Sequence, residues 1–453
     1  MTRAKPIKEA SYHTQQRQPL DTTVLRDTTD FASLKEEWDG LYQSCPSATP
    51  FQSWEWLYSW WEAYGGAYDL RLVTVRNEGL LVGLLPLMVR RGRLLLLGDN
   101  VKILYKRIAT PYKDVLVREG WEEPVAHAGA QALKMGAWGV ADLQELMPEA
   151  AAWALFRRWE GPKTRVPITD YVLIHAASWE ELLASLSKKQ RKTARRTLRS
   201  AEQDGLRWKP AGPENAGRAA RRLVGLHREL WRGRRIDPED LTPRHEAFME
   251  AAARRMTARG IGRISELRRD DDRVIVSQFL VFDKDFVGVY AIGASQEATQ
   301  RYQFMTLCNW DVMNIAHSRG GAHVSWMHYI SNEKLRWASE VVSSHRALLG
   351  RNLAFWLPYA GYYVLRDRYY TLRSKTQLYV HSEGAPRWIK KATERYYALM
   401  GYPYSENAPR WVKNATARYY ALRSRYGYGW LRYSLALVRA RRQIRRSNAS
   451  LKD

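Results

Sequence analysis

The sequence predicts a mixed α/β protein that continues into a basic, aromatic-rich helical region. Two observations support the α/β part: helical and strand-like hydrophobic patterns alternate over residues 30–327, and short polar turns join several of the strand-like runs. Such turns connect antiparallel neighbours, so the sheet is expected to be mixed rather than purely parallel. The third observation is a change in composition, because residues 351–453 hold 21 Lys and Arg against five Asp and Glu.

The chain as a whole is long, basic and poor in cysteine. Its 453 residues predict two or three domains. The formal net charge of +25 favours anionic partners such as membrane headgroups, nucleic acid or coenzyme A. Cys45 and Cys308 lie too far apart in sequence to indicate a disulfide framework or a metal cluster, and no metal site is predicted.

The N-terminal residues and the apolar stretches bear on location. Residues 1–20 are expected to form a disordered leader, because they are polar and lack the apolar core of a signal peptide. The longest apolar stretch, Leu80 to Val89, is too short to span a bilayer. The sequence therefore predicts a cytoplasmic protein, peripheral at the inner membrane face if its basic region binds lipid.

The first part of the chain begins with helices and continues with strands. Apolar residues recur at helical spacing through residues 30–64, which end at a Gly-Gly pair. Strands are predicted over residues 70–75, 80–88, 94–97 and 112–117. A helical pattern with a short strand around Leu143 follows over residues 124–158. Two prolines within residues 160–180 mark a domain boundary.

The second part repeats the order of helices before strands. One long basic helix is predicted over residues 179–203 and another helix over residues 214–232. Strands are expected over residues 262–267, 274–282 and 286–292, separated by Asp-rich turns. A helix over residues 302–318 and a strand over residues 322–327 complete the pattern.

The last hundred residues contain an internal repeat. Residues 385–399 (APRWIKKATERYYAL) recur as residues 408–422 (APRWVKNATARYYAL), an offset of 23 positions. Each copy reads as a helix with Pro in its first turn. Arg beside Trp and Tyr suits an interfacial helix on anionic lipid, stacking on single-stranded nucleic acid, or packing against the protein body. These three interpretations stay open.

Four stretches together resemble a known family. They are Pro50 to Gly65 (PFQSWEWLYSWWEAYG), Leu72 to Leu87 with its ending VGLLPL, Trp179 to Gly205, and Tyr329 to Trp337 (YISNEKLRW). In order and spacing they make residues 30–340 similar to the GNAT-like acyltransferases of bacterial cellulose and exopolysaccharide biosynthesis, the CelD/BcsL group. Fem-type aminoacyltransferases are more distantly similar.

The resemblance implies two GNAT-like lobes. Residues 21–165 would form a degenerate N-terminal lobe, and residues 166–350 a C-terminal lobe that holds an acyl-CoA and its acceptor; residues 351–453 lie outside the resemblance. The expected function is acyl-CoA-dependent N- or O-acyl transfer to a cell-envelope glycan, lipid or amino-sugar precursor. Two alternatives stay open: a Fem-like aminoacyltransferase that uses aminoacyl-tRNA, and a non-catalytic GNAT-like scaffold docked to a membrane or a polysaccharide synthase.

The resemblance also assigns catalytic and cofactor residues. Glu333 is the candidate general base, since the similar motif places a Glu there, and His328 and Tyr329 are candidate proton relays. The alternative role of Glu333 is that of a surface carboxylate paired with Lys334 or Arg336. The segment that would meet the cofactor pyrophosphate, Ser295 to Met305, contains no glycine, so the candidates there are Gln300, Arg301 and Tyr302.

Acceptor binding is assigned to three further groups. Asp114 occupies a position similar to the family's in the first lobe, and a turn or cap is its alternative role. Arg228 and Trp231 belong to an LHR-x-x-W element, where packing is the main alternative. The residues themselves point to the third group, a dense basic run that is either an anion-binding helix or a solvated one: Lys188, Lys189, Arg191, Lys192, Arg195, Arg196 and Arg199.

Overall fold

The fold is taken from a computed structural model, which describes residues 19–99, 110–232, 238–320, 323–328 and 332–365. The first elements in chain order are β1 (Asp21–Leu25), α1 (Thr28–Ser33), α2 (Lys35–Gln43), α3 (Trp54–Tyr64), β2 (Asp69–Asn77), β3 (Leu80–Arg90), β4 (Arg93–Leu96), β5 (Leu116–Val117), α4 (Glu122–Met135), β6 (Val140–Leu146) and α5 (Ala152–Arg158). The predicted helices and strands of this part are confirmed, except over residues 112–117.

The remaining elements follow in chain order. They are β7 (Lys163–His175), α6 (Trp179–Ser185), α7 (Lys188–Gln203), β8 (Arg207–Pro210), α8 (Ala216–Leu230), α9 (Pro243–Arg259), β9 (Gly262–Arg268), β10 (Val274–Asp283), β11 (Phe286–Ala294), α10 (Gln296–Arg301), α11 (Phe304–Ser318), β12 (His323–His328), α12 (Asn332–Leu335) and β13 (Glu340–Gly350). A final helix covers residues 353–365. Five of these elements, β8, α9, α10, α12 and β13, have no counterpart among the predicted ones.

One mixed sheet connects the described strands, in the order β1-β2-β3-β4-β6-β13-β7-β12-β11-β10-β9-β8, with β5 against β3. We call the strands β1, β2, β3, β4, β6 and β13 the first half of the sheet, and the strands β7, β12, β11, β10, β9 and β8 the second half. Outward from the β13–β7 pair, each half runs antiparallel, parallel, antiparallel and antiparallel. The halves are therefore mirrored in topology, and the predicted mixed α/β fold is confirmed.

The two halves exchange their central strands. β7 follows α5 in sequence but pairs with β12, and β13 follows β12 in sequence but pairs with β6. The chain thus crosses the centre of the sheet twice. Because of this exchange, β7 runs continuously from Lys163 to His175, through the stretch where the sequence predicts a domain boundary.

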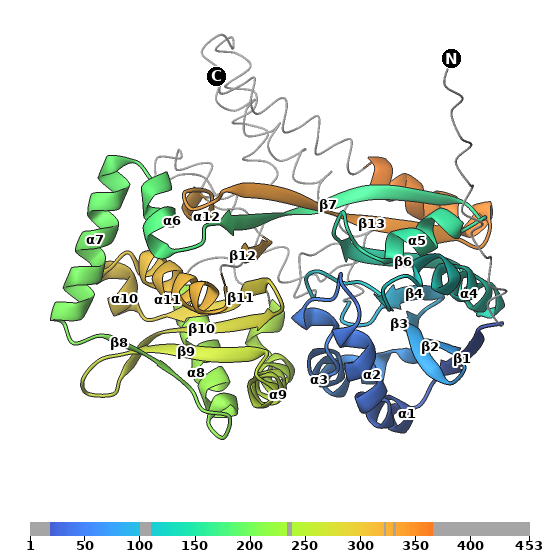
Figure 1. Ribbon diagram of the computed structural model, residues 1–453, viewed down its shortest axis with the longest axis horizontal. Helices are drawn as coiled ribbons and strands as arrows, with labels where there is room; N and C mark the ends of the chain where they lie inside the picture. The colour runs from blue at the N-terminus through green and yellow to red at the C-terminus, as the bar shows by residue number, and fades with distance from the viewer. Residues whose placement is uncertain (1–18, 100–109, 233–237, 321–322, 329–331, 366–453) are drawn as a thin grey trace, which may run out of the picture. The chain divides into compact units, whose positions relative to one another are not determined.

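Helices cover both faces of the sheet (Figure 1). Alternate residues of β4 show the two faces, since Leu94 and Leu96 pack in the core beneath α4 and α5, whereas Leu95 and Leu97 pack in the core shared by α1–α3, α8 and α9. In the second half a separate core lies beneath α6, α7 and α11.

Ion pairs join α3 and α9 across the two halves. Arg255 pairs with Glu62, and Arg259 pairs with Glu55 and Asp39. Glu55 is almost fully buried, so these contacts fix the two halves together in a partly desolvated setting.

Two sequence predictions need correction. Residues 112–117 form a strand only at Leu116 and Val117, because Tyr112 takes a left-handed backbone conformation, with φ of 51°, and the chain turns there. The long basic helix over residues 179–203 is two helices, because Ser187 has extended backbone and starts α7 with a capping box that includes Gln190.

No helix among the described residues is long and apolar enough to cross a bilayer. Residues 1–18 of the predicted leader and the repeats over residues 385–399 and 408–422 lie outside the described residues.

Candidate active site

A parallel pair of strands opens in the second half of the sheet. β11 and β12 are paired over three positions, from Phe286 with His323 to Gly288 with Ser325. Beyond these positions β10 is the one partner strand of β11 among the described residues. β12 bulges at the same point, since Met327 has φ of 53° and the register with β7 shifts between Ser325 and His328. β11 and β12 therefore diverge at this point of the sheet.

A lysine holds the bulged end of β12. The Lys334 ammonium donates to the carbonyl oxygens of Trp326 at 2.7 Å and His328 at 2.8 Å. Burial disfavours its charged form and lowers the pKa of Lys334 to about 8. An amine with such a pKa is suited to proton transfer near neutral pH, and the same two bonds fix the geometry of the bulge.

The three predicted catalytic residues differ in their placement. Glu333 lies next to Lys334 on α12, with its carboxylate exposed and 3.1 Å from the guanidinium of Arg336. His328 is half-buried at the end of β12, its ring edge-on to Tyr171 at 5.9 Å. Tyr329 lies outside the described residues. The catalytic assignment stays a prediction, and both of its alternative partners, Lys334 and Arg336, lie beside Glu333.

Aromatic side chains line the junction between the halves at this point. The Tyr112 hydroxyl donates to Ser325 Oγ of β12 at 2.7 Å. Its ring stacks on Phe51 with centroids 6.2 Å apart and meets Phe286 and Tyr171 edge-on. The segment that leads into β5 in the first half thus places a tyrosine against the opening of the second half.

The predicted cofactor residues are engaged with the end of α7. The Tyr302 hydroxyl donates to Asp204 and the Arg301 guanidinium pairs with the same carboxylate. Burial and this acidic partner raise the pKa of Tyr302 to about 12. Gln300 is exposed at the end of α10. An anionic ligand at this position would have to compete with Asp204 for Arg301.

Asp114 is buried and caps a helix. Its carboxylate accepts from the backbone N–H groups of Ala151 at 2.7 Å, Ala152 at 2.9 Å and Val115 at 2.8 Å. The Ser47 hydroxyl also donates to it, at 3.1 Å. Burial raises the pKa of Asp114 to about 6, against the lowering effect of these bonds. The contacts match the cap role that the sequence left open, and the acceptor-binding role stays a prediction.

The LHR-x-x-W element holds α8 to its neighbours. His227 Nδ1 is 2.7 Å from the carbonyl oxygen of Ile292 on β11, so Nδ1 is the protonated nitrogen. Arg228 pairs with Glu246 at 3.2 Å. Trp231 is exposed, with its ring tilted against that of His227. His227 therefore connects α8 directly to the strand that borders the opening.

The predicted basic run forms most of α7. Lys188, Lys192, Arg195 and Arg199 follow one another at spacings of four, three and four residues, so they lie on one face. Ala194, Thr197 and Ala201 are buried on the opposite face. Among the described residues, none of the seven cations of the run has an ion-pair partner. The helix therefore presents a stripe of uncompensated positive charge to solvent.

Sequence reasoning missed a buried ionic cluster in the first half of the sheet. Asp142 on β6 is fully buried and accepts from Arg93, Tyr359 and Gln144, with Arg346 Nε 2.8 Å away. Nearby, Glu145 accepts from the hydroxyls of Tyr171 at 2.8 Å and Ser344 at 2.9 Å. An acid inside the apolar run VADLQEL was the only local signal. The partners of Asp142 and Glu145 come from β4, β7, β13 and the last helix. The hydrophobic periodicity of the sequence does not indicate that these elements meet.

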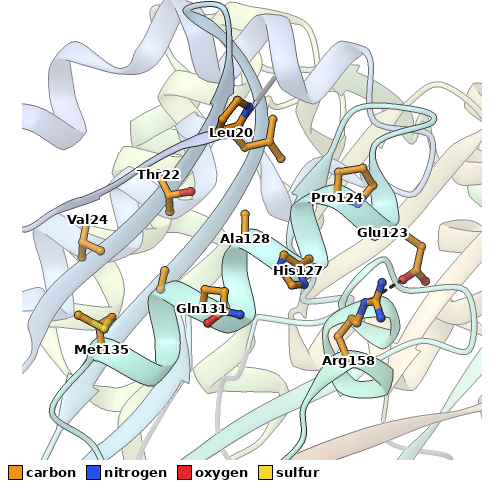
Figure 2. A pocket seen from close by; sticks show the side chains of 12 residues that line it. Leu20, Thr22, Val24, Glu123, Pro124, His127, Ala128, Gln131, Met135 and Arg158 are labelled. Atoms are coloured by element: carbon orange, nitrogen blue, oxygen red, sulfur yellow. Dashed lines mark ion pairs between the residues drawn. The ribbon is translucent and has the colours of Figure 1, made fainter. Parts of the chain in front are cut away.

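A surface pocket lies away from all of these residues (Figure 2). β1 and α4 form its walls, with Arg158 of α5 at one side. Its lining is mostly apolar, and no predicted site residue belongs to it. In the part of the chain that the structure describes, no group of three or more His, Cys, Asp or Glu is arranged to hold a metal ion.

The comparisons with known proteins agree with the fold of the second half. Residues 188–334 match the family model of an acetyltransferase (GNAT) domain. These residues run from the first residue of α7 to Lys334 and include the open β11–β12 pair. No curated protein matches the chain. The GNAT part of the fold prediction is confirmed, and the chain carries a GNAT-type acyltransferase fold; the likeness to the CelD/BcsL group stays a prediction.

Several solved structures are similar to the chain. FemX has 11% sequence identity and a TM-score of 0.49, covering 72% of this chain and 96% of its own. L-PGS from Bacillus licheniformis has 12% identity and a TM-score of 0.45, covering 74% and 95%. The C-terminal domain of a putative lysylphosphatidylglycerol synthetase from Agrobacterium fabrum has 10% identity and a TM-score of 0.45, covering 70% and 92%.

Proposed function

We propose that the protein is an acyl-CoA-dependent N- or O-acyltransferase that acts on a cell-envelope glycan, lipid or amino-sugar precursor. The observation that carries the proposal is the open β11–β12 pair inside the residues that match the acetyltransferase family model. We assign the two lobes to residues 21–165 and 166–350, with the transfer site in the second. The envelope acceptor and the charge of residues 351–453 support a peripheral location at an anionic membrane.

The residues present suit the chemistry of coenzyme A. Its pantetheine arm carries amides, and strand backbone that the sheet ladder leaves unused can pair with such groups. Its phosphates need cations, and the stripe on α7 supplies cations that have no described partner. Acyl-CoA would bring an activated thioester to the site. The chain's own groups then have to orient the acceptor and take up its proton.

Glu333 is the proposed base and Lys334 its supporting group. Acyl transfer would form a bond between the acceptor nitrogen or oxygen and the acyl carbon and break the carbon–sulfur bond, so that coenzyme A would leave as its thiolate and take up a proton. The proton that the acceptor loses goes to Glu333, which is exposed and close to the end of β12. Lys334 holds the carbonyls of Trp326 and His328, so it keeps the bulge open at that place.

A calorimetric and thermal-shift titration with acetyl-CoA and longer acyl-CoAs, at two salt concentrations, tests the proposal. Saturable binding that raises the melting temperature supports it. The Glu333→Gln variant should then bind acyl-CoA as the wild type does and lose transfer to an amine or hydroxyl acceptor. Absence of binding to every acyl-CoA would overturn it.

Aminoacyl-tRNA is a second candidate donor, favoured by the cations of α7, which have no ion-pair partner among the described residues. A phosphate backbone bound there would release counterions, so its affinity should fall steeply with salt. A non-catalytic scaffold is favoured instead by the aromatic packing of Tyr112 against β12. Binding of bulk tRNA without acyl-CoA binding would select the first of these, and binding of neither would select the scaffold.

A further inference from the structure

The last described helix, residues 353–365, is apolar around its whole circumference. Its sequence, LAFWLPYAGYYVL, contains no charged residue and lies between Arg351 and Arg366. A helix of this composition is usually buried on all sides. At about 1.5 Å per residue it is roughly 20 Å long, too short to span a bilayer.

One face of this helix packs firmly on the first half of the sheet. Ala360 and Tyr363 are buried with Val140, Val166 and Leu348. The Tyr359 hydroxyl donates to Asp142 at 2.8 Å, and the guanidinium of Arg346 lies 3.6 Å from the ring centre of Tyr363. The helix is therefore held in place by polar as well as apolar contacts, and its orientation is fixed.

The first turns of the helix are exposed outside that face, although they are equally apolar. Leu353, Phe355 and Leu357 are 65%, 61% and 61% exposed. Met135, at the end of α4, is 89% exposed. It lies beside the helix start, because Arg351 donates to the carbonyl oxygens of Lys134 and Gly136 on either side of it. We call Met135, Leu353, Phe355 and Leu357 the apolar patch; they lie around the first turns of the helix, and exposed apolar side chains that gather at one place mark a contact with a protein or a membrane.

Charge distinguishes a membrane from a protein partner. Residues 366–453, which follow the helix directly, carry 20 Lys and Arg against five Asp and Glu. Each basic residue near an anionic bilayer contributes about 1 kcal/mol to binding. Apolar side chains next to a basic segment, with aromatic residues at the boundary, are the combination that holds a protein on an anionic lipid surface.

We propose that the apolar patch inserts into the surface of an anionic lipid bilayer, with the helix over residues 353–365 lying along it. This inference rests on the peripheral location in the proposed function and names the described side chains that make the contact. An acceptor borne on that membrane would then be presented to a protein whose orientation is fixed through β6, β13 and α4.

The experiment is cosedimentation of the full chain with vesicles of phosphatidylcholine alone or mixed with phosphatidylglycerol. The test variant is Leu353→Ser/Phe355→Ser/Leu357→Ser. The matched control is Leu80→Ser/Leu241→Ser, which removes apolar side chains that are 54% and 51% exposed elsewhere. The wild type and the control should bind the mixed vesicles equally. The test variant should bind at least tenfold more weakly, with an unchanged melting temperature and the same thermal shift with acyl-CoA.

Three results would overturn the inference. The test variant could bind anionic vesicles as tightly as the wild type. The test variant could be a monomer where the wild type is a dimer, with vesicle binding unchanged. That result would mean that a second copy of the chain covers the patch. The test variant could also have a melting temperature several degrees lower, with vesicle binding unchanged. That result would mean that residues 366–453 cover the patch. If the wild type binds no vesicles, the peripheral location falls as well, while the acyl-CoA thermal shift still decides the proposed transfer activity.

Discussion

The two halves of the sheet share one topology but differ in what fills their centres. In each half a parallel pair is formed over three positions, β4 with β6 and β11 with β12. The third position holds Asp142 in the first half and Ser325 in the second. Asp142 is surrounded by two guanidinium groups and a tyrosine hydroxyl, whereas Ser325 meets only the hydroxyl of Tyr112 and nearby neutral groups.

This difference indicates separate roles for two similar frames. A buried carboxylate fixed by Arg93 and Arg346 cannot move without leaving charges unpaired, so the first half is suited to hold the sheet and the last helix together. The second half keeps a weaker polar contact at the equivalent position, and β11 runs on from Gly288 to Ala294 beyond its pairing with β12, whereas β4 ends at Leu96. Four predictions test this contrast.

The largest effect is expected from removing the first-half acid. Asp142→Ala should lower the free energy of unfolding by about 3–5 kcal/mol, because the buried Arg346 loses its counter-charge. The matched change in the second half, Ser325→Ala, should cost only about 1 kcal/mol, the usual value of one hydrogen bond. Urea denaturation of both variants measures the contrast. Equal losses would show that the two halves are stabilised alike.

The next effect depends on pH and concerns Asp114. Its pKa of about 6 in the folded protein lies above the unfolded value of about 3.9, so the folded state holds the proton longer. The stability of the wild type relative to Asp114→Asn should therefore fall by about 2 kcal/mol as the pH rises from 4 to 6. Above pH 7 the difference should be constant. A difference that rises over this window would mean that the helix-capping bonds outweigh burial.

Lys334 should show the opposite trend in a higher window. Its pKa of about 8 lies below the unfolded value of about 10.4, so the folded state releases the proton first. The stability of the wild type relative to Lys334→Met should rise by about 1–2 kcal/mol between pH 8 and pH 10, a figure reduced because the side chain is partly exposed. Unfolding curves at four pH values measure it, and a flat difference would contradict burial of the ammonium.

The smallest effect on stability is expected at Glu333. It is exposed and pairs with Arg336 three residues away, so Glu333→Gln should change the free energy of unfolding by less than about 0.5 kcal/mol. Arg336→Ala serves as the control for the ion pair. If Glu333 is the base, its substitution removes acyl transfer while leaving stability intact. A loss of stability larger than that of Arg336→Ala would assign the carboxylate a structural role.

Local patterns in the sequence were sufficient for much of the fold. The hydrophobic periodicity over residues 30–64 and 262–292 predicted elements that the structure contains, because both patterns are set by neighbours a few residues apart. The same holds for the charge of α7, since its cations follow one another on a single helix. A local capping signal also stands at Ser187, where a Ser with Gln three residues later divides the predicted helix in two.

The candidate site was only partly accessible to such reasoning. The sequence placed Glu333 and His328 near the end of one strand, and the structure has them on and beside the bulged end of β12. It gave no sign of Lys334 as the group that holds that bulge, because its acceptors are backbone carbonyls and carry no residue identity. Arg301 and Tyr302 looked available as ligands, yet both contact Asp204, about a hundred positions earlier in the chain.

The sequence by itself determined the class of fold, the positive charge and the candidate residues on single elements. Only the tertiary structure decided the exchange of β7 and β13, the burial of Asp142 between guanidinium groups, and the exposure of the helix over residues 353–365. The physical reason is the separation in sequence between the residues that come into contact. Helix and strand periodicity depends on contacts within a few residues, whereas Asp142 with Arg346 and Tyr112 with Ser325 join positions about two hundred residues apart, which meet only after the whole sheet has formed.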